Sequence, residues 1–301
     1  MAETVEVSVI IPCYRAGDVL PRFVSDLKAQ DFAGTWEAIF VADGEAEGET
    51  LAAVLDDPRF RLVVRPHRGV SAARNAGLEA ARGEIVLFAD ADDQLAPAWM
   101  SNLAKAIDGV DVAWGGFRLR TAECETLQLP EDAGAVYRGA AVRRRIWRAV
   151  FGYRVRDILR WGTRKRLWRG CRREFGTVWC RAFRRTALAD VRFDETLALN
   201  EDALFLAACA QKLGSLRILG DTGYVYVAGD SGAVARETRQ RLVANKFLLR
   251  DARAKLDPQM THWRGTFLLS AVEVARAAGW RAAVRYLLFK PFDNTSTRSS
   301  S

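Results

Sequence analysis

Residues 69–93 read GVSAARNAGLEAARGEIVLFADADD. Ser71 to Ala81 is predicted to be helical, and Glu84 to Phe88 is a short apolar run with the length of a buried strand. The carboxylates of Asp90, Asp92 and Asp93 follow this strand directly. A helix that leads into a buried strand is typical of βαβ units, in which neighbouring strands run parallel.

The same alternation extends to both sides of this stretch. Short apolar strands are predicted at Val5–Pro12, Trp36–Ala42, Arg61–Val64 and Val110–Trp114. Helices are predicted between them at Asp18–Gln30, Glu47–Leu55 and Ala98–Ile107. The sequence therefore predicts an α/β fold with a mainly parallel sheet flanked by helices.

In open sheets of this kind, ligands bind beyond the carboxyl ends of the strands. Suggestive residues follow four predicted strands: Pro12-Cys13-Tyr14-Arg15, Asp43-Gly44, Arg65-Pro66-His67 and Asp90-Ala91-Asp92-Asp93. No GxGxxG turn and no Walker loop follows the first strand, which disfavours dinucleotide oxidoreductases and P-loop enzymes.

Spaced carboxylates at the end of an apolar strand indicate a cation site. Mg²⁺ and Mn²⁺ take carboxylate oxygens and commonly bridge one or two carboxylates to substrate phosphates. Asp92 or Asp93 before Ala96-Pro97 would also fit a helix cap. Because these aspartates follow a strand end, a metal-binding role is favoured over a helix cap.

The positive charge is concentrated in one segment. Residues 138–173 contain fourteen arginines and lysines against Asp157 alone, whereas the rest of the chain carries a net charge of −5. Tryptophans lie among these arginines, which is typical of a surface that meets phosphates and an apolar boundary together. The residues taken as membrane or acceptor contacts are Arg143, Arg144, Arg145 and Trp147. A solvated helical hairpin explains the same pattern, and a nucleic-acid surface is not expected because no reading motif is present.

The composition sets further bounds. The chain has 301 residues, 50% of them hydrophobic, which is enough for a large α/β domain with an appendage. No apolar run reaches the roughly 20 residues of a membrane-spanning helix, and no signal peptide is recognised. Five cysteines without a CxxC pair, and only two histidines, disfavour a zinc site and favour a reducing cytosol.

Four motifs coincide in order and spacing with a known family. They are Val7-Ser8-Val9-Ile10-Ile11-Pro12-Cys13-Tyr14, Asp43-Gly44, Gly69 to Gly77, and Asp90-Ala91-Asp92-Asp93. Together they resemble the family 2 inverting glycosyltransferases of GT-A fold. The resemblance continues through Val178-Trp179, Phe183-Arg184-Arg185, Arg192-Phe193-Asp194 and Asn200-Glu201-Asp202, spaced as in bacterial members that build polysaccharide or lipopolysaccharide. It covers about the first 115 residues and then 177 to 231.

The resemblance implies a role for each matching residue. Donor-binding positions would be Pro12, Tyr14, Arg15, Asp43, Arg74, Asp90 and Ala91, with Asp43 on the uracil and Asp90 on the ribose. Asp92 would bind Mn²⁺ or Mg²⁺ on the diphosphate. The catalytic base would come from Asp202, favoured over Glu201, and a base at a helix start is compatible with Asn200 as the N-cap. Trp179, before a predicted helix, would form an acceptor-side wall or belong to the core.

These assignments predict a catalytic domain at 1–231 with a basic helical insertion at about 138–174. A helical region at 232–292 and a disordered tail at 293–301 would follow. The expected reaction moves a hexose-type sugar from a UDP-sugar to a saccharide or lipid-linked acceptor. We expect the protein in the cytoplasm, peripheral at an anionic inner membrane surface.

Two rival functions explain part of the pattern. A nucleotidyltransferase would use a similar sheet but should carry a glycine-rich loop with a lysine after the first strand, which this chain lacks. A non-catalytic module that binds nucleotide sugars or nucleic acid would explain the basic segment but not Asn200-Glu201-Asp202. Arg15, Ala42 and Glu45 depart from the family pattern, at positions that concern recognition of the base.

Overall fold

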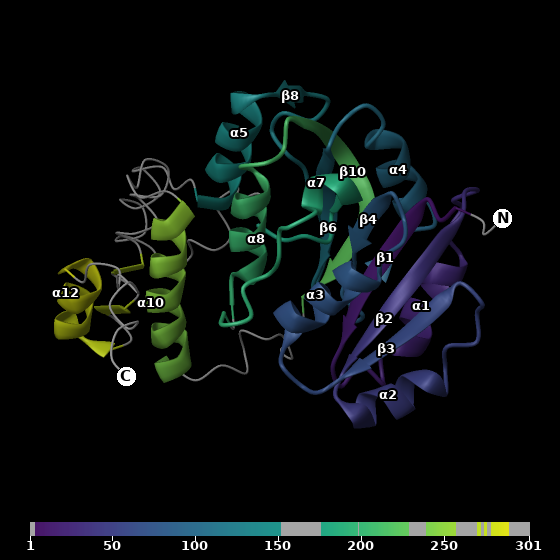
Figure 1. The fold of residues 1–301 in the computed structure, drawn as a ribbon, viewed down its shortest axis with the longest axis horizontal. Coiled ribbons are helices and arrows are strands. Elements are labelled where there is room, and N and C mark those ends of the chain that lie inside the picture. The colour runs from purple at the N-terminus through teal and green to yellow at the C-terminus, as the bar shows by residue number, and fades with distance from the viewer. Residues whose placement is uncertain are drawn as a thin grey trace, which may run out of the picture.

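The computed structural model describes residues 4–151, 176–197, 199–228, 239–256, 270–271, 274–275 and 278–288. These residues form one ten-stranded sheet flanked by helices (Figure 1). In sheet order the strands are β3 (Phe60–Arg65), β2 (Trp36–Asp43), β1 (Val7–Cys13), β4 (Ile85–Phe88), β9 (Arg181–Arg184), β6 (Val112–Arg120), β10 (Ser215–Val227) and β5 (Gln94–Leu95). β7 (Glu125–Gln128) pairs with β6, and β8 (Val136–Arg138) pairs with β10. The predicted α/β fold is confirmed.

The first half of the sheet is purely parallel and follows the predicted alternation. Its elements are β1 (Val7–Cys13), α1 (Leu20–Lys28), β2 (Trp36–Asp43), α2 (Glu45–Ala52), β3 (Phe60–Arg65), α3 (Val70–Ala80) and β4 (Ile85–Phe88). β1 pairs in parallel with β2 and β4, and β2 pairs in parallel with β3. The side chains of β2 are buried along its whole length, as expected for a strand covered on both faces.

The second half is mixed. Its elements are β5 (Gln94–Leu95), α4 (Trp99–Ala106), β6 (Val112–Arg120), β7 (Glu125–Gln128), β8 (Val136–Arg138), α5 (Ala140–Phe151), β9 (Arg181–Arg184), α7 (Arg185–Leu188), α8 (Glu201–Cys209) and β10 (Ser215–Val227). β9 lies antiparallel between β4 and β6, and β10 runs parallel to β6. Trp179 therefore precedes a central strand, and the expected helix at that point begins only at Arg185.

Two packing contacts position the helices that matter for function. Gly77 of α3 lies directly against Ile10 of β1, and a Cβ at position 77 would collide with the Ile10 side chain. At α8, Phe205 stacks on Phe193 with ring centroids 3.9 Å apart and meets Phe88 of β4 edge to face. Both α3 and the start of α8 are therefore fixed against the central strands.

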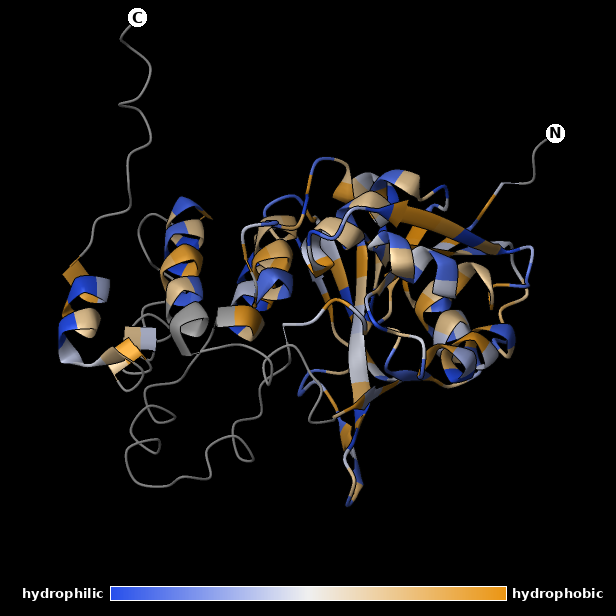
Figure 2. Cartoon of the chain, turned by 90° about the horizontal axis from the view of Figure 1, so that it is seen from below, coloured by the Kyte–Doolittle hydropathy of each residue, from blue (hydrophilic) through white to orange (hydrophobic). Residues whose placement is uncertain are grey.

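Two helices lie beyond the sheet, within the predicted region 232–292. α10 (Arg239–Leu256) packs along α8 through Leu249 and Leu204, and α12 (Trp280–Leu288) packs on α10 through Tyr286 and Phe247. In Figure 2, α10 and α12 lie outside the sheet domain and carry both hydrophobic and hydrophilic residues.

Parts of the predicted organisation fall outside the described residues. Of the basic insertion, the structure describes α5, whereas residues 152–175 and the tail 293–301 are not described. Within the described part of the chain, no helix combines the length and hydropathy needed to cross a bilayer. The described cysteines, Cys13, Cys124, Cys180 and Cys209, are free thiols.

Candidate functional site

The predicted site residues meet at the carboxyl ends of the parallel strands. Cys13 of β1 pairs in register with Ala42 of β2, so Tyr14 and Asp43 leave the sheet at the same edge. Phe88 of β4 pairs with Ile10 of β1, which brings Asp90 to this edge as well. The first turns of α3 lie nearby and supply Arg74.

Arg74 is the centre of the site. Its side chain is 3% exposed, and its Nη2 donates to Asp90 Oδ1 at 2.9 Å. Its Nη1 donates to Asp202 Oδ1 at 2.7 Å and to Glu201 Oε1 at 3.0 Å. The Nε of Arg74 is buried without a hydrogen-bond partner among the described residues. One guanidinium thus joins the end of β4 to the start of α8, and it keeps one buried donor unused.

Asp202 is poised to accept a proton near neutral pH. Burial, which the charge of Arg74 opposes most strongly, raises the pKa of Asp202 to about 7; the charges of Glu201 and Asp90 contribute to this rise, and Arg181 also opposes it. The carboxyl still reaches solvent, since its side chain is 14% exposed. A carboxylate with this pKa is well matched to general-base chemistry at physiological pH.

The backbone before α8 sets the position of Asp202. Asn200 is at the N-cap position, as expected, but it adopts a left-handed conformation (φ 63°) and makes no side-chain capping bond. The preceding Leu199 is held instead by Asn245 of α10, whose Nδ2 donates to the Leu199 carbonyl at 2.9 Å and whose Oδ1 accepts the Leu199 N–H at 3.3 Å. Nothing in the local sequence indicates this brace.

The three aspartates after β4 differ in their surroundings. Asp93 is buried and accepts hydrogen bonds from the Tyr224 hydroxyl at 2.6 Å and the Val227 N–H at 2.9 Å, and burial raises its pKa well above the usual range. Asp90 is partly exposed and held by Arg74, whereas Asp92 is exposed. Arg22 donates to the carbonyl oxygens of Asp92 and Asp93 and fixes this turn.

This arrangement fits a cation that shares its ligands with a substrate. Among the described residues there is no group of three or more acidic, histidine or cysteine side chains placed to hold a metal ion. Asp92 is exposed, whereas the preceding Ala91 is buried. Mg²⁺ and Mn²⁺ are commonly bound in this way, by one or two carboxylates together with substrate phosphates.

Asp43 holds the loop that follows β3. Its Oδ1 and Oδ2 accept the backbone N–H groups of Arg68 and Gly69 at 2.9 and 2.8 Å, and His67 Nδ1 lies 2.8 Å from Oδ2. The His67 ring stacks on Tyr14 with centroids 4.4 Å apart. The sequence placed His67 at this edge because it follows a predicted strand, but it did not indicate the contacts of His67 with Asp43 and Tyr14.

The loop after β1 has a second acidic anchor. Glu47 of α2 accepts the N–H groups of Arg15 and Ala16 at 2.6 and 3.1 Å. Arg15 is held in a left-handed conformation (φ 55°), and its guanidinium lies 5.2 Å from the Tyr14 ring centroid. Pro12, half-buried at the end of β1, precedes this loop.

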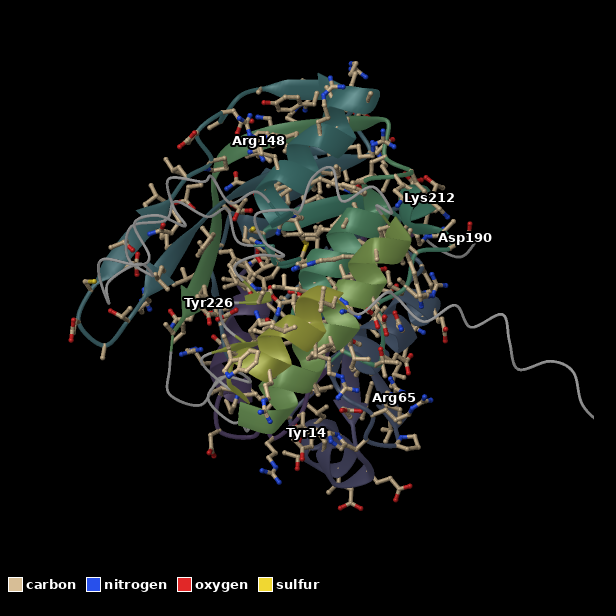
Figure 3. All side chains as sticks on the ribbon, turned by 90° about the vertical axis from the view of Figure 1, so that its left-hand side faces the viewer. Tyr14, Arg65, Arg148, Asp190, Lys212 and Tyr226 are labelled. Atoms are coloured by element: carbon tan, nitrogen blue, oxygen red, sulfur yellow. The ribbon has the colours of Figure 1, made fainter. Side chains whose placement is uncertain are left out.

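The predicted acceptor and membrane residues divide into two groups. Trp179 is buried and stacks on Tyr224 (4.5 Å) and Tyr226 (5.5 Å), of which Tyr226 is partly exposed. It therefore belongs to the core, with Tyr226 as the outer ring of the stack; Figure 3 labels Tyr226.

The basic residues of α5 do not share one surface. Arg143 and Arg144 are exposed. Arg145 is bound to Asp132 at 2.6 Å, and Trp147 is buried with its Nε1 donating to the Ala207 carbonyl. The expectation that Arg145 and Trp147 face a membrane or acceptor is corrected in this structure, because α5 packs these side chains against the main domain.

Known proteins are similar to this chain in sequence or in fold. The chain is 27% identical to the succinoglycan biosynthesis protein ExoO of Rhizobium meliloti, over 95% of this chain and 82% of that protein. Staphylococcus aureus TarS 1-349 in complex with UDP-GlcNAc superimposes with a TM-score of 0.60 at 17% identity, covering 94% of this chain and 81% of the TarS 1-349 chain.

A second solved structure with this fold holds a different nucleotide sugar. The mannosyltransferase PcManGT of Pyrobaculum calidifontis, in complex with GDP-Man and Mn²⁺, superimposes with a TM-score of 0.54 at 16% identity, over 95% of this chain and 75% of that one. At these identities both likenesses concern the fold. Residues 8–192, more than half of the chain, match the family description "Glycosyl transferase family 2", and the chain belongs to this family.

Proposed function

We propose that this glycosyltransferase is an inverting enzyme that moves a hexose-type sugar from a UDP-sugar to a saccharide or lipid-linked saccharide acceptor. The observation that carries the proposal is the joining of Asp90, at the end of β4, to Asp202, at the start of α8, by the buried Arg74. Asp90, which we assign to the sugar donor, and Asp202, which we assign to the acceptor, are then bound to the same guanidinium.

The proposed reaction is a single displacement. The acceptor hydroxyl attacks the anomeric carbon while Asp202 takes its proton, and the bond from that carbon to the diphosphate oxygen breaks. UDP leaves with the electron pair of this bond, and the configuration at the anomeric carbon inverts. A Mg²⁺ or Mn²⁺ ion at Asp92 would supply charge neutralisation for the leaving diphosphate.

Several contacts support the donor side. Arg74 places a cationic guanidinium at the end of β4, and Tyr14 offers an exposed ring that stacks on His67, the residue that contacts Asp43. Because Asp43 accepts two backbone N–H groups and also lies 2.8 Å from His67 Nδ1, we expect it mainly to hold the loop and to meet the uracil with a remaining lone pair. The UDP-GlcNAc complex of TarS, which has the same fold, favours uridine over guanosine as the first donor class to test.

The acceptor class and cellular place are inferred from the relatives and the surface. ExoO is named for polysaccharide biosynthesis, which supports a cell-surface polysaccharide or lipopolysaccharide pathway. The exposed arginines of α5, Arg143 and Arg144, support contact with an anionic membrane surface or a lipid-linked acceptor. We place the enzyme in the cytoplasm, peripheral at the inner face of the membrane.

The deciding experiment is UDP release from a panel of UDP-sugars in the presence of Mn²⁺. We expect metal-dependent release with one donor, reduced at least about a hundredfold in Asp202→Asn and Asp92→Asn. Asp190→Asn, which makes the same change at an exposed aspartate paired with Lys212, is the matched control and should retain activity.

Other outcomes would reject the proposal in different ways. Donor binding by calorimetry without turnover would indicate a non-catalytic binding module. Turnover of a GDP-sugar in place of every UDP-sugar would overturn the uridine assignment and leave the transferase assignment standing.

A further inference from the structure

We infer that α12 is a membrane-interfacial helix whose exposed apolar face inserts into an anionic bilayer. The inference rests on the proposed function only in placing the enzyme at a membrane. It assigns the membrane contact to α12, whereas the sequence predicted that contact in the basic insertion at about 138–174.

The exposed face of α12 is apolar. Trp280 is 69% exposed and Leu288 is 76% exposed, and Val284 and Leu287 are about two-fifths exposed. Their spacing of four, three and one residues places all four on one side of the helix. Single exposed apolar residues are ordinary, but a continuous stripe along a whole helix marks an interaction surface.

The helix cannot turn this stripe inward, because its other side is already fixed. Tyr286 is fully buried and meets the Phe247 ring of α10 edge to face at 5.2 Å. Arg250 of α10 also donates to the carbonyl of Tyr286 at 2.8 Å. α12 therefore packs on α10 through one side and presents Trp280 and Leu288 outward.

Charge and size favour a lipid surface as the occupant. Besides its apolar residues, α12 contains Arg281 and Arg285, both exposed, and no acidic residue. A helix with an exposed tryptophan and leucines beside arginines is suited to the boundary of an anionic bilayer. Its nine residues span about 13 Å. The exposed face of a helix this short has a smaller area than the roughly 800 Å² that each partner buries in a specific dimer interface.

The position of α12 in the molecule agrees with this role. α10 and α12 form the side of the molecule opposite α1 and α2 in Figure 1. Seen from that side in Figure 3, they lie nearest the viewer, with Arg148 of α5 above them. An inserted α12 would leave the sheet domain in water.

The test is co-sedimentation of the full chain with vesicles of equal parts phosphatidylglycerol and phosphatidylcholine. We expect binding by the parent chain and a loss of at least about tenfold in Trp280→Ser/Leu288→Ser. The control, Leu127→Ser/Leu129→Ser, removes two half-exposed leucines in and just after β7 and should bind like the parent. Quenching by brominated lipid should be present in the parent and reduced in Trp280→Phe.

Solution measurements keep this inference separate from the proposed function. UDP release without vesicles should be the same in all these variants, because α12 is not part of the catalytic site. Unchanged vesicle binding in the α12 variant, or no binding by the parent, would overturn the inference. A parent dimer that the α12 variant converts to monomer, without vesicle binding, would instead assign the face to a second copy. Vesicle binding that follows α12, with no sugar turned over, would leave the inference standing and remove the proposed function.

Discussion

At the scale of single residues, Arg74 connects groups that the sequence places in separate motifs. The spacing of the motifs predicted that Asp43, Arg74 and Asp90 would lie at one sheet edge, because parallel strands deliver their ends to the same side. It did not predict that Arg74 binds Asp90 and Asp202 together, because that contact spans 128 residues and depends on the packing of α8. Tyr226 was missed for a similar reason, since β10 carries no motif.

The pH dependence of the reaction follows from Asp202. With a pKa of about 7 in the free enzyme, Asp202 is increasingly protonated below neutral pH, so kcat/KM should fall about tenfold per pH unit there. Glu201→Gln removes a charge that raises this pKa, so the acid limb should move to lower pH. The measurement is the pH profile of UDP release.

The roles of the two acidic residues are separable in the same assay. Asp202→Asn should remove the acid limb along with most of the activity, whereas Glu201→Gln should lower the rate far less. A Glu201→Gln enzyme that is inactive beside an active Asp202→Asn enzyme would make Glu201 the base.

Tyr226 is expected to act on the acceptor side, as the outer ring of the stack on Trp179. Tyr226→Ala should raise the acceptor KM about fivefold, corresponding to the loss of one aromatic contact of ~1 kcal/mol, whereas Tyr226→Phe should keep the acceptor KM of the parent. UDP release to water should be unaffected by either change. Equal acceptor kinetics in the parent and Tyr226→Ala would reject this role.

At the scale of the elements, Glu37 ties the first three strands together at the edge opposite the site. Its carboxylate accepts bonds from Ser8 of β1, Arg61 of β3 and Arg82 before β4, and these partners lower its pKa to about 2. Glu37→Gln should lower the free energy of unfolding on the order of 2 kcal/mol at neutral pH, a figure kept modest because both arginines reach solvent.

The sign of the pH effect at Glu37 is fixed by the depressed pKa. The stabilisation is fully present above the ordinary value of 4.5 and is lost as the pH falls toward 2. Urea unfolding of parent and variant should therefore converge in acid. UDP release per folded molecule should be unchanged, and a constant difference in stability down to pH 2 would contradict the assignment.

α10 is expected to support catalysis from outside the sheet, because Asn245 holds the backbone at Leu199 just before the catalytic pair. Asn245→Ala should lower kcat about tenfold with little change in donor KM, since a small displacement of Asp202 weakens proton transfer. Asn245→Asp keeps one acceptor for the Leu199 N–H, so its kcat should lie between those of the parent and Asn245→Ala. A variant that loses stability but keeps its kcat would reduce Asn245 to a packing residue.

The elements differ in how far the sequence predicted them. The parallel half was predicted within a few residues, because each strand there is a short apolar run between clear helix and turn signals. β9 and β10 were not predicted: β9 is four residues long and begins with a buried arginine, Arg181, and β10 is interrupted by bulges near Asp221. Their pairing depends on partners far along the chain, which local pattern does not reveal.

At the scale of the whole molecule, charge and apolar surface are divided between separate elements. The chain has a net charge of +8, yet the part outside residues 138–173 is acidic, so attraction to an anionic surface should be local. On α5, Arg143, Arg144 and Arg148 are exposed, while Arg145 is paired with Asp132 and Trp147 is buried against α8. α12 supplies the apolar contact that α5 therefore lacks.

This division predicts that salt affects vesicle binding differently in variants of α5 and of α12. Arg143→Gln/Arg144→Gln should weaken binding to anionic vesicles by roughly tenfold or more, at about 1 kcal/mol per arginine near the surface, and should make binding less sensitive to salt. The matched control, Lys28→Gln/Lys105→Gln, removes two charges from α1 and α4 and should bind like the parent. In the Trp280→Ser/Leu288→Ser variant the remaining binding should instead be abolished by salt, because only the electrostatic part is left. If the α5 variant and the α12 variant showed the same salt dependence of vesicle binding, this division into an electrostatic contact at α5 and an apolar contact at α12 would be wrong.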